Sequence, residues 1–142
     1  MPKFYFEKLI DSQREKVFKV FTNFSEYQKL IPQYFPSVRI LSSRNEVSVI
    51  EEHLMLGDRE LVVMTKHVVE EPKRHEMFVI GGDAKGTHIV ERFEPISSGT
   101  KLLVFADFKL KGGMKISSLL GRNKVENDYS KIMDEFVKIA ET

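Results

Sequence analysis

The stretch RHEMFVIGGDAKGTHIVERFEPISSGTKLLVFADFKL, residues 74–110, contains three strand-length runs of apolar, β-branched and aromatic residues. Turn-forming residues separate the runs, GGD at 81–83 and PISSG at 95–99. Connections this short join antiparallel neighbours, because a parallel crossover needs about a dozen residues or more. The stretch therefore predicts three successive strands of an antiparallel meander, over Arg74–Ile80, Lys85–Glu94 and Thr100–Leu110.

Residues 80–90, IGGDAKGTHIV, also have the glycine spacing of a phosphate-binding loop. Such a loop needs a lysine and a hydroxyl directly after its last glycine, and a helix that begins there. Here Thr87 follows Gly86, Lys85 precedes it, and strand-forming residues come next. We interpret the segment as a β-hairpin, and a nucleotide site is the weaker alternative.

The same alternation of strands and turns begins further upstream. Lys3–Ile10 is predicted as a first strand, and Ser37–Arg44, Val47–Leu56 and Glu60–Glu70 continue the meander. Two short helices are expected between the first two strands. One begins at a capping box, Ser12 to Glu15, and the other covers Ser25–Ile31 and ends at Pro32.

After the last strand, Ile116–Ala140 is predicted as one long helix. Its apolar stripe includes Val125, Tyr129, Ile132, Met133, Phe136 and Ala140. A curled sheet of seven strands must cover its concave face, and this helix is the only element long and apolar enough. The expected fold class is α+β, a single domain over residues 1–142 with a curved seven-stranded antiparallel sheet wrapped around the C-terminal helix and a cavity between them.

The composition narrows the class of protein. Twenty-two basic and 21 acidic residues leave a net charge of +1, which disfavours nucleic acid as a partner. The chain has no cysteine, so disulfides and thiol nucleophiles are excluded. The N-terminal residues lack a secretory pattern, and no run of about 18 apolar residues occurs, so we expect a soluble cytoplasmic protein.

Four stretches resemble the START-related (SRPBCC) superfamily and its helix-grip fold. They are SQREKVFKVFTNFSEYQKLIPQYFPSVRIL at 12–41, EEPKRHEM at 70–77, ERFEPISSGTKLLVF at 91–105 and SLLGRNKVENDYSKIMDEFVKIA at 118–140. The resemblance is strongest to the polyketide cyclase/dehydrase-like branch, which holds the coenzyme Q-binding proteins and the ribosome-association toxin family. It implies a cavity for a lipid, prenylquinone or polyketide-like ligand and no obligatory metal or cofactor. Peripheral membrane contact for ligand exchange is considered as a further expectation.

Candidate ligand-binding residues follow from the period of two along the strands and the stripe on the helix. They are Thr65, His67, Met77, Ile89, Glu91, Val104, Ala106, Phe108, Met133 and Phe136. Tight hairpins would place His67 beside His75 and Met77 beside Glu91. A carboxylate beside imidazoles is suited to proton transfer or to holding a ligand carbonyl.

Other interpretations of these polar residues stay open. A register error of one residue would turn them all to solvent, and buried histidines often only satisfy hydrogen bonds. A metal site is a weaker alternative, since the spacing of the histidines and Glu91 matches no ligand motif. His53 and His88 are expected on other faces of the sheet. Glu91 also departs from the resemblance, because family members often carry a large aromatic residue there.

Three functions compete at this stage. We favour a carrier or sensor of a hydrophobic small molecule that binds without turnover. The alternatives are an aromatase or cyclase, in which Glu91 or a histidine moves protons, and a protein-interaction module. A homodimer through outward-facing Leu103 and Phe105 is also considered, as are mobile rims of the cavity at Arg59-Glu60 and at residues 111–115.

Overall fold

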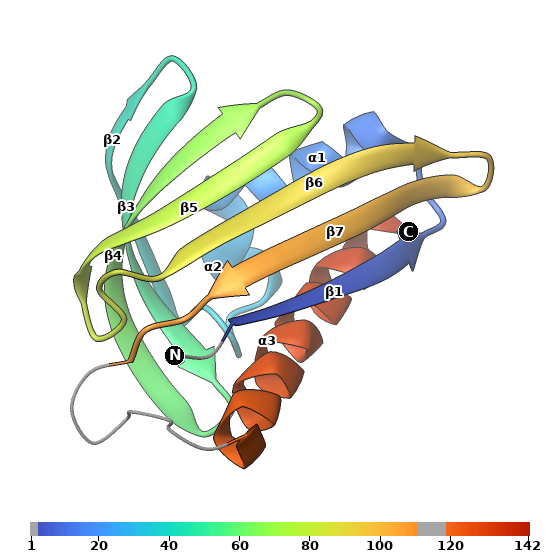
Figure 1. Cartoon of the computed structure of the whole chain (residues 1–142). Helices are drawn as coiled ribbons and strands as arrows, with labels where there is room; N and C mark the ends of the chain where they lie inside the picture. The colour runs from blue at the N-terminus through green and yellow to red at the C-terminus, as the bar shows by residue number, and fades with distance from the viewer. Residues whose placement is uncertain (1–2, 111–118) are drawn as a thin grey trace.

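The computed structural model describes residues 3–110 and 119–142 of the chain. Its elements are β1 (Lys3–Ile10), α1 (Arg14–Thr22), η1 (Phe24–Glu26), α2 (Tyr27–Leu30), β2 (Ser37–Arg44), β3 (Val47–Leu56), β4 (Arg59–Glu70), β5 (Arg74–Gly82), β6 (His88–Ile96), β7 (Gly99–Asp107) and α3 (Leu119–Ala140). Figure 1 shows the sheet curving around α3, with α1 and α2 on the same side. The predicted helix-grip α+β fold is confirmed.

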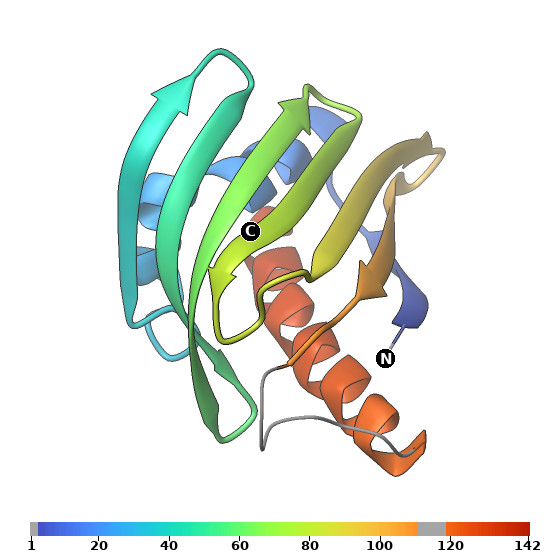
Figure 2. The same ribbon diagram turned by 60° about the vertical axis from the view of Figure 1, so that its left-hand side comes forward.

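All seven strands form one antiparallel sheet in the order β1-β7-β6-β5-β4-β3-β2. The meander from β2 to β7 places each strand beside the next, and β1 closes the far edge by pairing with β7. In the turned view of Figure 2, α3 is seen side-on, on the same side of the sheet as α1 and α2. Both edges of the sheet, β1 and β2, are left unpaired within the described residues.

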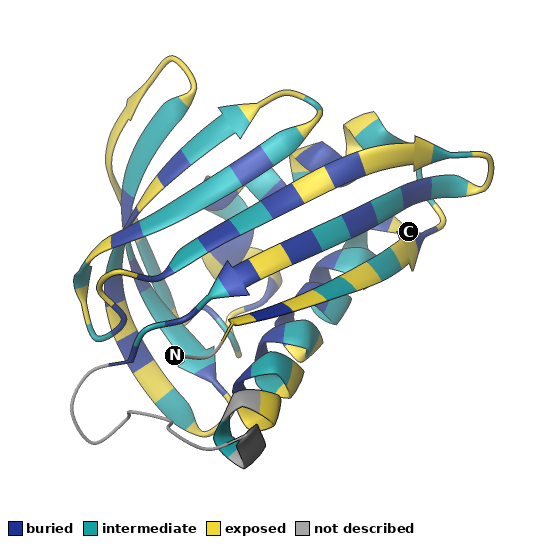
Figure 3. Ribbon diagram, in the orientation of Figure 1, coloured by how far each residue is buried: buried dark blue, intermediate teal, exposed yellow. Residues whose placement is uncertain are grey.

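Aromatic residues join the three layers of the core. The ring of Phe21 from α1 lies 5.6 Å from Phe93 of β6 and 5.1 Å from Phe136 of α3, measured between centroids. The period of two is plain in Figure 3, where buried residues alternate along β6 and β7 with residues that are intermediate or exposed. On β7 the expected inward set, which includes Leu102, Val104 and Ala106, is buried.

Several predicted boundaries are wrong. The helix α1 begins at Arg14 after Gln13, and no side chain caps it, so the expected capping box does not form. The second helix is a 3-10 turn, η1, followed by the single turn of α2. The strand β6 begins at His88 and β7 ends at Asp107, each three residues short of the prediction. The expected start of the last helix, Ile116, lies outside the described residues.

Residues 83–87 connect β5 to β6 in a hairpin, and Gly81 and Gly82 are the last residues of β5. Strand β6, and no helix, follows Thr87, so the helix N-terminus of a phosphate-binding loop is missing there. Gly82 has a φ of +92° and pairs with Val63 of β4. The Asp83 carboxylate accepts a hydrogen bond from the Val62 N–H at 2.8 Å, which ties the connection to β4.

We expect Gly82→Ala to destabilise the protein by about 2 kcal/mol or more. The φ is strained for alanine, and the added Cβ would lie 2.1 Å from the backbone oxygen of Val62. Gly81→Ala is the matched control, since its Cβ would only approach the Met64 Cβ at 3.6 Å. Urea denaturation followed by circular dichroism measures both variants. Equal losses for the two substitutions would contradict the assigned backbone conformation.

Candidate functional site

A small cavity lies between the concave face of the sheet and α3. Its volume is about 50 Å³, and residues from α2, from β3 to β6 and from α3 line it. Eight of the ten predicted site residues are among the lining residues: Thr65, His67, Met77, Ile89, Glu91, Phe108, Met133 and Phe136. The other two, Val104 and Ala106, are buried but do not line this cavity.

Four polar residues form a continuous hydrogen-bonded row along the wall of the cavity, which we call the polar chain: Glu52, His67, His75 and Glu91. The carboxylate of Glu52 lies 2.9 Å from Nε2 of His67. His67 Nδ1 lies 2.8 Å from His75 Nε2, and His75 Nδ1 lies 2.7 Å from Oε1 of Glu91. All four residues are buried, with exposed fractions of 6%, 1%, 1% and 2% in chain order.

The register of the sheet brings the members of the polar chain together. They come from four consecutive strands, β3, β4, β5 and β6, and each points to the concave face. His75 lies directly opposite Glu91, whereas His67 is opposite Met77 and reaches His75 diagonally. The predicted contact between the histidines is therefore present. The prediction that Met77 neighbours Glu91 is wrong, because Met77 pairs with Ile89.

Glu52 was missed by the sequence analysis, although its strand carries a signal. Within β3, Ile50, Glu52 and Leu56 share one alternating set and all three are buried. A carboxylate in phase with apolar residues indicates an inward-facing acid. Its partner could not be found from β3 alone, since the partner depends on the pairing with β4.

Phe24 covers the two imidazoles from the helical layer. Its ring centroid lies 4.3 Å from that of His67 and 5.4 Å from that of His75. Under this ring both histidines are buried from solvent, each with 1% of its surface exposed. The imidazoles therefore exchange hydrogen bonds with each other and with the two carboxylates in a low-dielectric surrounding.

Burial shifts the titration of several groups around the polar chain. Desolvation lowers the pKa of His67, and the nearby carboxylate of Glu52 opposes the shift. Desolvation raises the pKa of Tyr27 and of Tyr129 well above 10.0, and the carboxylates of Glu91 and Glu52 raise both further. Both tyrosines line the cavity, and Tyr27 donates its hydroxyl proton to the backbone oxygen of Phe21.

The two other histidines lie on the outer face of the sheet, as expected. His53 Nδ1 lies 2.9 Å from Glu60 Oε2, and His88 Nε2 lies 2.6 Å from Glu76 Oε2. Their side chains are 33% and 43% exposed. In the described part of the chain, no three His, Asp or Glu side chains are grouped so that they could hold a metal ion.

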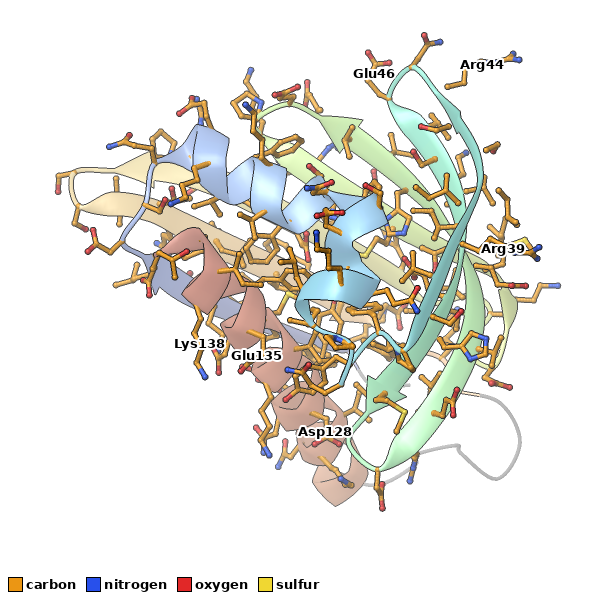
Figure 4. All side chains as sticks on the ribbon, turned by 180° about the vertical axis from the view of Figure 1, so that it is seen from behind. Arg39, Arg44, Glu46, Asp128, Glu135 and Lys138 are labelled. Atoms are coloured by element: carbon orange, nitrogen blue, oxygen red, sulfur yellow. The ribbon has the colours of Figure 1, made fainter. Side chains whose placement is uncertain are left out.

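The turn between β3 and β4 lies against α3. Gly57 in this turn has a φ of +67°, and a Cβ there would come within 2.4 Å of the Asp128 carboxylate. Figure 4 shows Asp128 on α3 near this end of the sheet, whereas Arg44 and Glu46 lie at the distant β2–β3 hairpin. Two segments were considered as mobile rims of the cavity. The first, Arg59-Glu60, forms the start of β4, and the second, residues 111–115, lies outside the described residues.

The site is thus a small, mostly apolar cavity with its charged groups gathered in one chain of hydrogen bonds. Carboxylates and imidazoles can accept or donate protons, and they can anchor one polar group of a ligand. The described residues contain no helix that is long and apolar enough to cross a bilayer. This fold and this site define the class: a helix-grip domain with a hydrophobic ligand-binding architecture.

The family follows from a comparison of sequences. A model described as "Polyketide cyclase / dehydrase and lipid transport" matches residues 10–137, and the chain belongs to this family. The predicted polyketide cyclase/dehydrase-like branch is confirmed. No curated protein matches the sequence.

Solved structures share the fold at low sequence identity. A START superfamily protein from Mycobacterium smegmatis aligns with a TM-score of 0.85 and 12% identity, over 98% of this chain and 97% of that one. The Zhui aromatase/cyclase from Streptomyces sp. R1128 aligns at 0.82 and 13%, over 98% and 93%. The protein TTHA0849 from Thermus thermophilus aligns at 0.79 and 15%, over 99% and 94%. Identities this low show the fold alone.

Proposed function

We propose that the protein binds a hydrophobic small molecule, such as a lipid, prenylquinone or polyketide-like compound, between the sheet and α3. The observation that carries the proposal is the layout of the cavity wall. Apolar side chains surround a single buried polar chain, as expected for a site in which apolar burial gives affinity and a few polar groups fix orientation.

The cavity must enlarge before it can hold a ligand of ordinary size. Ligand pockets usually have volumes of roughly 300–1,000 Å³, and this cavity has about 50 Å³. A ligand of that size must therefore displace side chains or move α3 away from the sheet. Met77 and Met133 line the cavity, and methionine readily changes rotamer to fill or to free space.

We expect the purified protein either to contain a ligand of this class already or to bind one that is added. Organic extraction followed by mass spectrometry should find a stoichiometric lipid or quinone in the purified protein. If the protein is empty, a short-chain prenylquinone or a fatty acid at 100 times its Kd should raise the free energy of unfolding by about 2.7 kcal/mol. An empty protein that no prenylquinone, fatty acid or polyketide analogue stabilises would overturn the proposal.

Adjacent residues of β4 offer a matched pair of variants for this assay. Val63 lines the cavity, whereas Val62 is 38% exposed on the outer face. Val63→Phe should abolish the ligand-dependent stabilisation because the larger ring fills the cavity. Val62→Phe should leave the stabilisation unchanged.

A second candidate is an enzyme of the aromatase or cyclase kind. The polar chain favours it, because acid–base groups inside an apolar cavity can move protons of a bound substrate. Structural similarity to the Zhui aromatase/cyclase supports this candidate only through the fold.

Contacts with other macromolecules remain proposals. The aromatic rings of Tyr5 and Phe105 lie 4.7 Å apart on the outer face, and each residue is 43% exposed. We propose this pair as the centre of a homodimer contact or of peripheral contact with a membrane during ligand exchange. Cytoplasmic localisation is likewise proposed.

A further inference from the structure

The polar chain contains more hydrogen bonds than its neutral histidines can supply with protons. Each of its three links, from Glu52 to His67 to His75 to Glu91, needs one proton between two heavy atoms. A carboxylate supplies none, and each neutral imidazole supplies one. One further proton must therefore reside in the chain, either on a carboxyl group or on an imidazole that becomes an imidazolium.

The net charge is the same wherever this proton resides. Two carboxylates contribute two negative charges, and the additional proton cancels one of them. The intact polar chain therefore carries a single negative charge. The described residues that line the cavity include no lysine or arginine to balance it.

Two arrangements of the three protons are mirror images along the chain. In the first, Glu52 is protonated, both imidazoles carry their proton on Nδ1, and Glu91 is an anion. In the second, Glu91 is protonated, both imidazoles carry their proton on Nε2, and Glu52 is an anion. Moving each proton across its own hydrogen bond converts one arrangement into the other.

We propose that the polar chain is a proton relay, in which three proton hops pass the acidic proton from one terminal carboxyl group to the other. Both carboxylates line the same cavity, so either can act on a ligand there. The relay deepens the proposed function, since it rests on a ligand in that cavity. The ligand class it fits is an apolar molecule with an enolisable carbonyl group.

The step balances without a further reactant. The Glu91 carboxylate takes the proton from the carbon beside the carbonyl, and the C–H electron pair forms the carbon–carbon double bond. The carbonyl π pair moves to oxygen, and Glu91 then gives the same proton to that oxygen, so the ketone becomes an enol and Glu91 is again an anion. The three hops that convert the first arrangement into the second make Glu52 the base in place of Glu91.

Two neighbouring titratable groups face the polar chain from the helices. They are Tyr27 of α2 and Tyr129 of α3, and both line the cavity. Burial raises the pKa of each well above 10.0, so both stay neutral at pH 6–8. Within this range, protons can move along the relay without a change of charge on these tyrosines.

Nitrogen-15 NMR of histidine side chains tests the relay in the ligand-free protein. In both mirror arrangements the central link holds one proton, on His67 Nδ1 in the first and on His75 Nε2 in the second. We expect both nitrogens to show chemical shifts between the protonated and unprotonated values. A static network would instead give one fully protonated and one fully unprotonated nitrogen, and that result would overturn the relay.

A substitution at one end of the polar chain should change the nitrogen chemical shifts nearer its other end. In Glu52→Gln the terminal amide cannot exchange a proton with the relay, so the central proton localises on one ring. The Nε2 shift of His75, an atom that bonds to His67 and not to residue 52, should therefore move to one of its limiting values. Glu91→Gln should have the corresponding effect on Nδ1 of His67.

Glu60→Gln is the matched control, because Glu60 contacts His53 at the same 2.9 Å outside the polar chain. It should change the shifts of His53 and leave both central nitrogens unchanged. An unchanged His75 in folded Glu52→Gln would overturn the relay, and the wild-type spectrum decides alone if the variants do not fold. Since no ligand is used, this failure is distinguishable from a failure of ligand binding.

Discussion

Replacing His75 by leucine is expected to lower the free energy of unfolding by about 3–5 kcal/mol. His75 is the central donor and acceptor of the polar chain, with His67 on one side and Glu91 on the other. Leucine fills much of the same space but makes neither hydrogen bond. The substitution leaves a buried carboxylate and a buried ring nitrogen without partners. Such groups lose their hydrogen bonds to water on folding and gain no hydrogen bond within the protein.

His53→Leu is the matched control for this loss. His53 also contacts a glutamate, Glu60, but its side chain is 33% exposed. Water can replace the lost partner there, so the change should stay below about 1 kcal/mol. Urea denaturation of both variants gives the comparison, and equal losses would show that the polar chain contributes no more than a surface pair.

A double variant separates the free-energy cost of the unpaired Glu91 carboxylate from the cost of the changed packing. Adding Glu91→Leu to His75→Leu removes the carboxylate that the first substitution leaves unpaired. The double variant should recover a large share of the lost stability, because an apolar replacement of a buried polar pair is often nearly neutral. A further loss of several kcal/mol on adding Glu91→Leu would mean that Glu91 has another stabilising partner.

The fold was predictable because the signals that define it are local. Short connections require antiparallel neighbours, and the alternation along β7 identifies the face that α3 covers. The same period placed Ile89 and Glu91 on the buried face, where the structure has them. Period and turn length are read from a few consecutive residues, so a single sequence is sufficient for them.

The site was only partly predictable because it depends on relations between strands. The connection from Gly82 to His88 is longer than a two-residue turn, so the residue opposite Glu91 could not be derived, and it is His75 in place of Met77. Glu52 joins the site across the β3–β4 pairing. The cavity volume depends on the distance between α3 and the sheet, which no local pattern reports.

Raising the pH above 10 is expected to unfold the protein steeply. Tyr27 and Tyr129 are buried, and desolvation together with the carboxylates of Glu91 and Glu52 raises their pKa values well above 10.0. In the unfolded chain both tyrosines ionise near pH 10. Their protonated forms are thus favoured by folding, and this contribution is fully present below pH 10 and is lost as the pH rises.

The sign and size follow from the number of protons bound in each state. Above pH 10 the folded protein keeps two tyrosine protons that the unfolded chain has released, so the free energy of unfolding falls by about 3 kcal/mol per pH unit.

The measurement is urea denaturation between pH 9 and 11.5 in a Tyr5→Phe background. That background removes the exposed tyrosine whose pKa a hydrogen bond to Glu7 raises to about 12. Adding Tyr129→Phe should halve the slope, because one of the two retained protons is removed. A slope that Tyr129→Phe leaves unchanged would show that this tyrosine already ionises in the folded protein, and hence that the space between α3 and the polar chain is open to water.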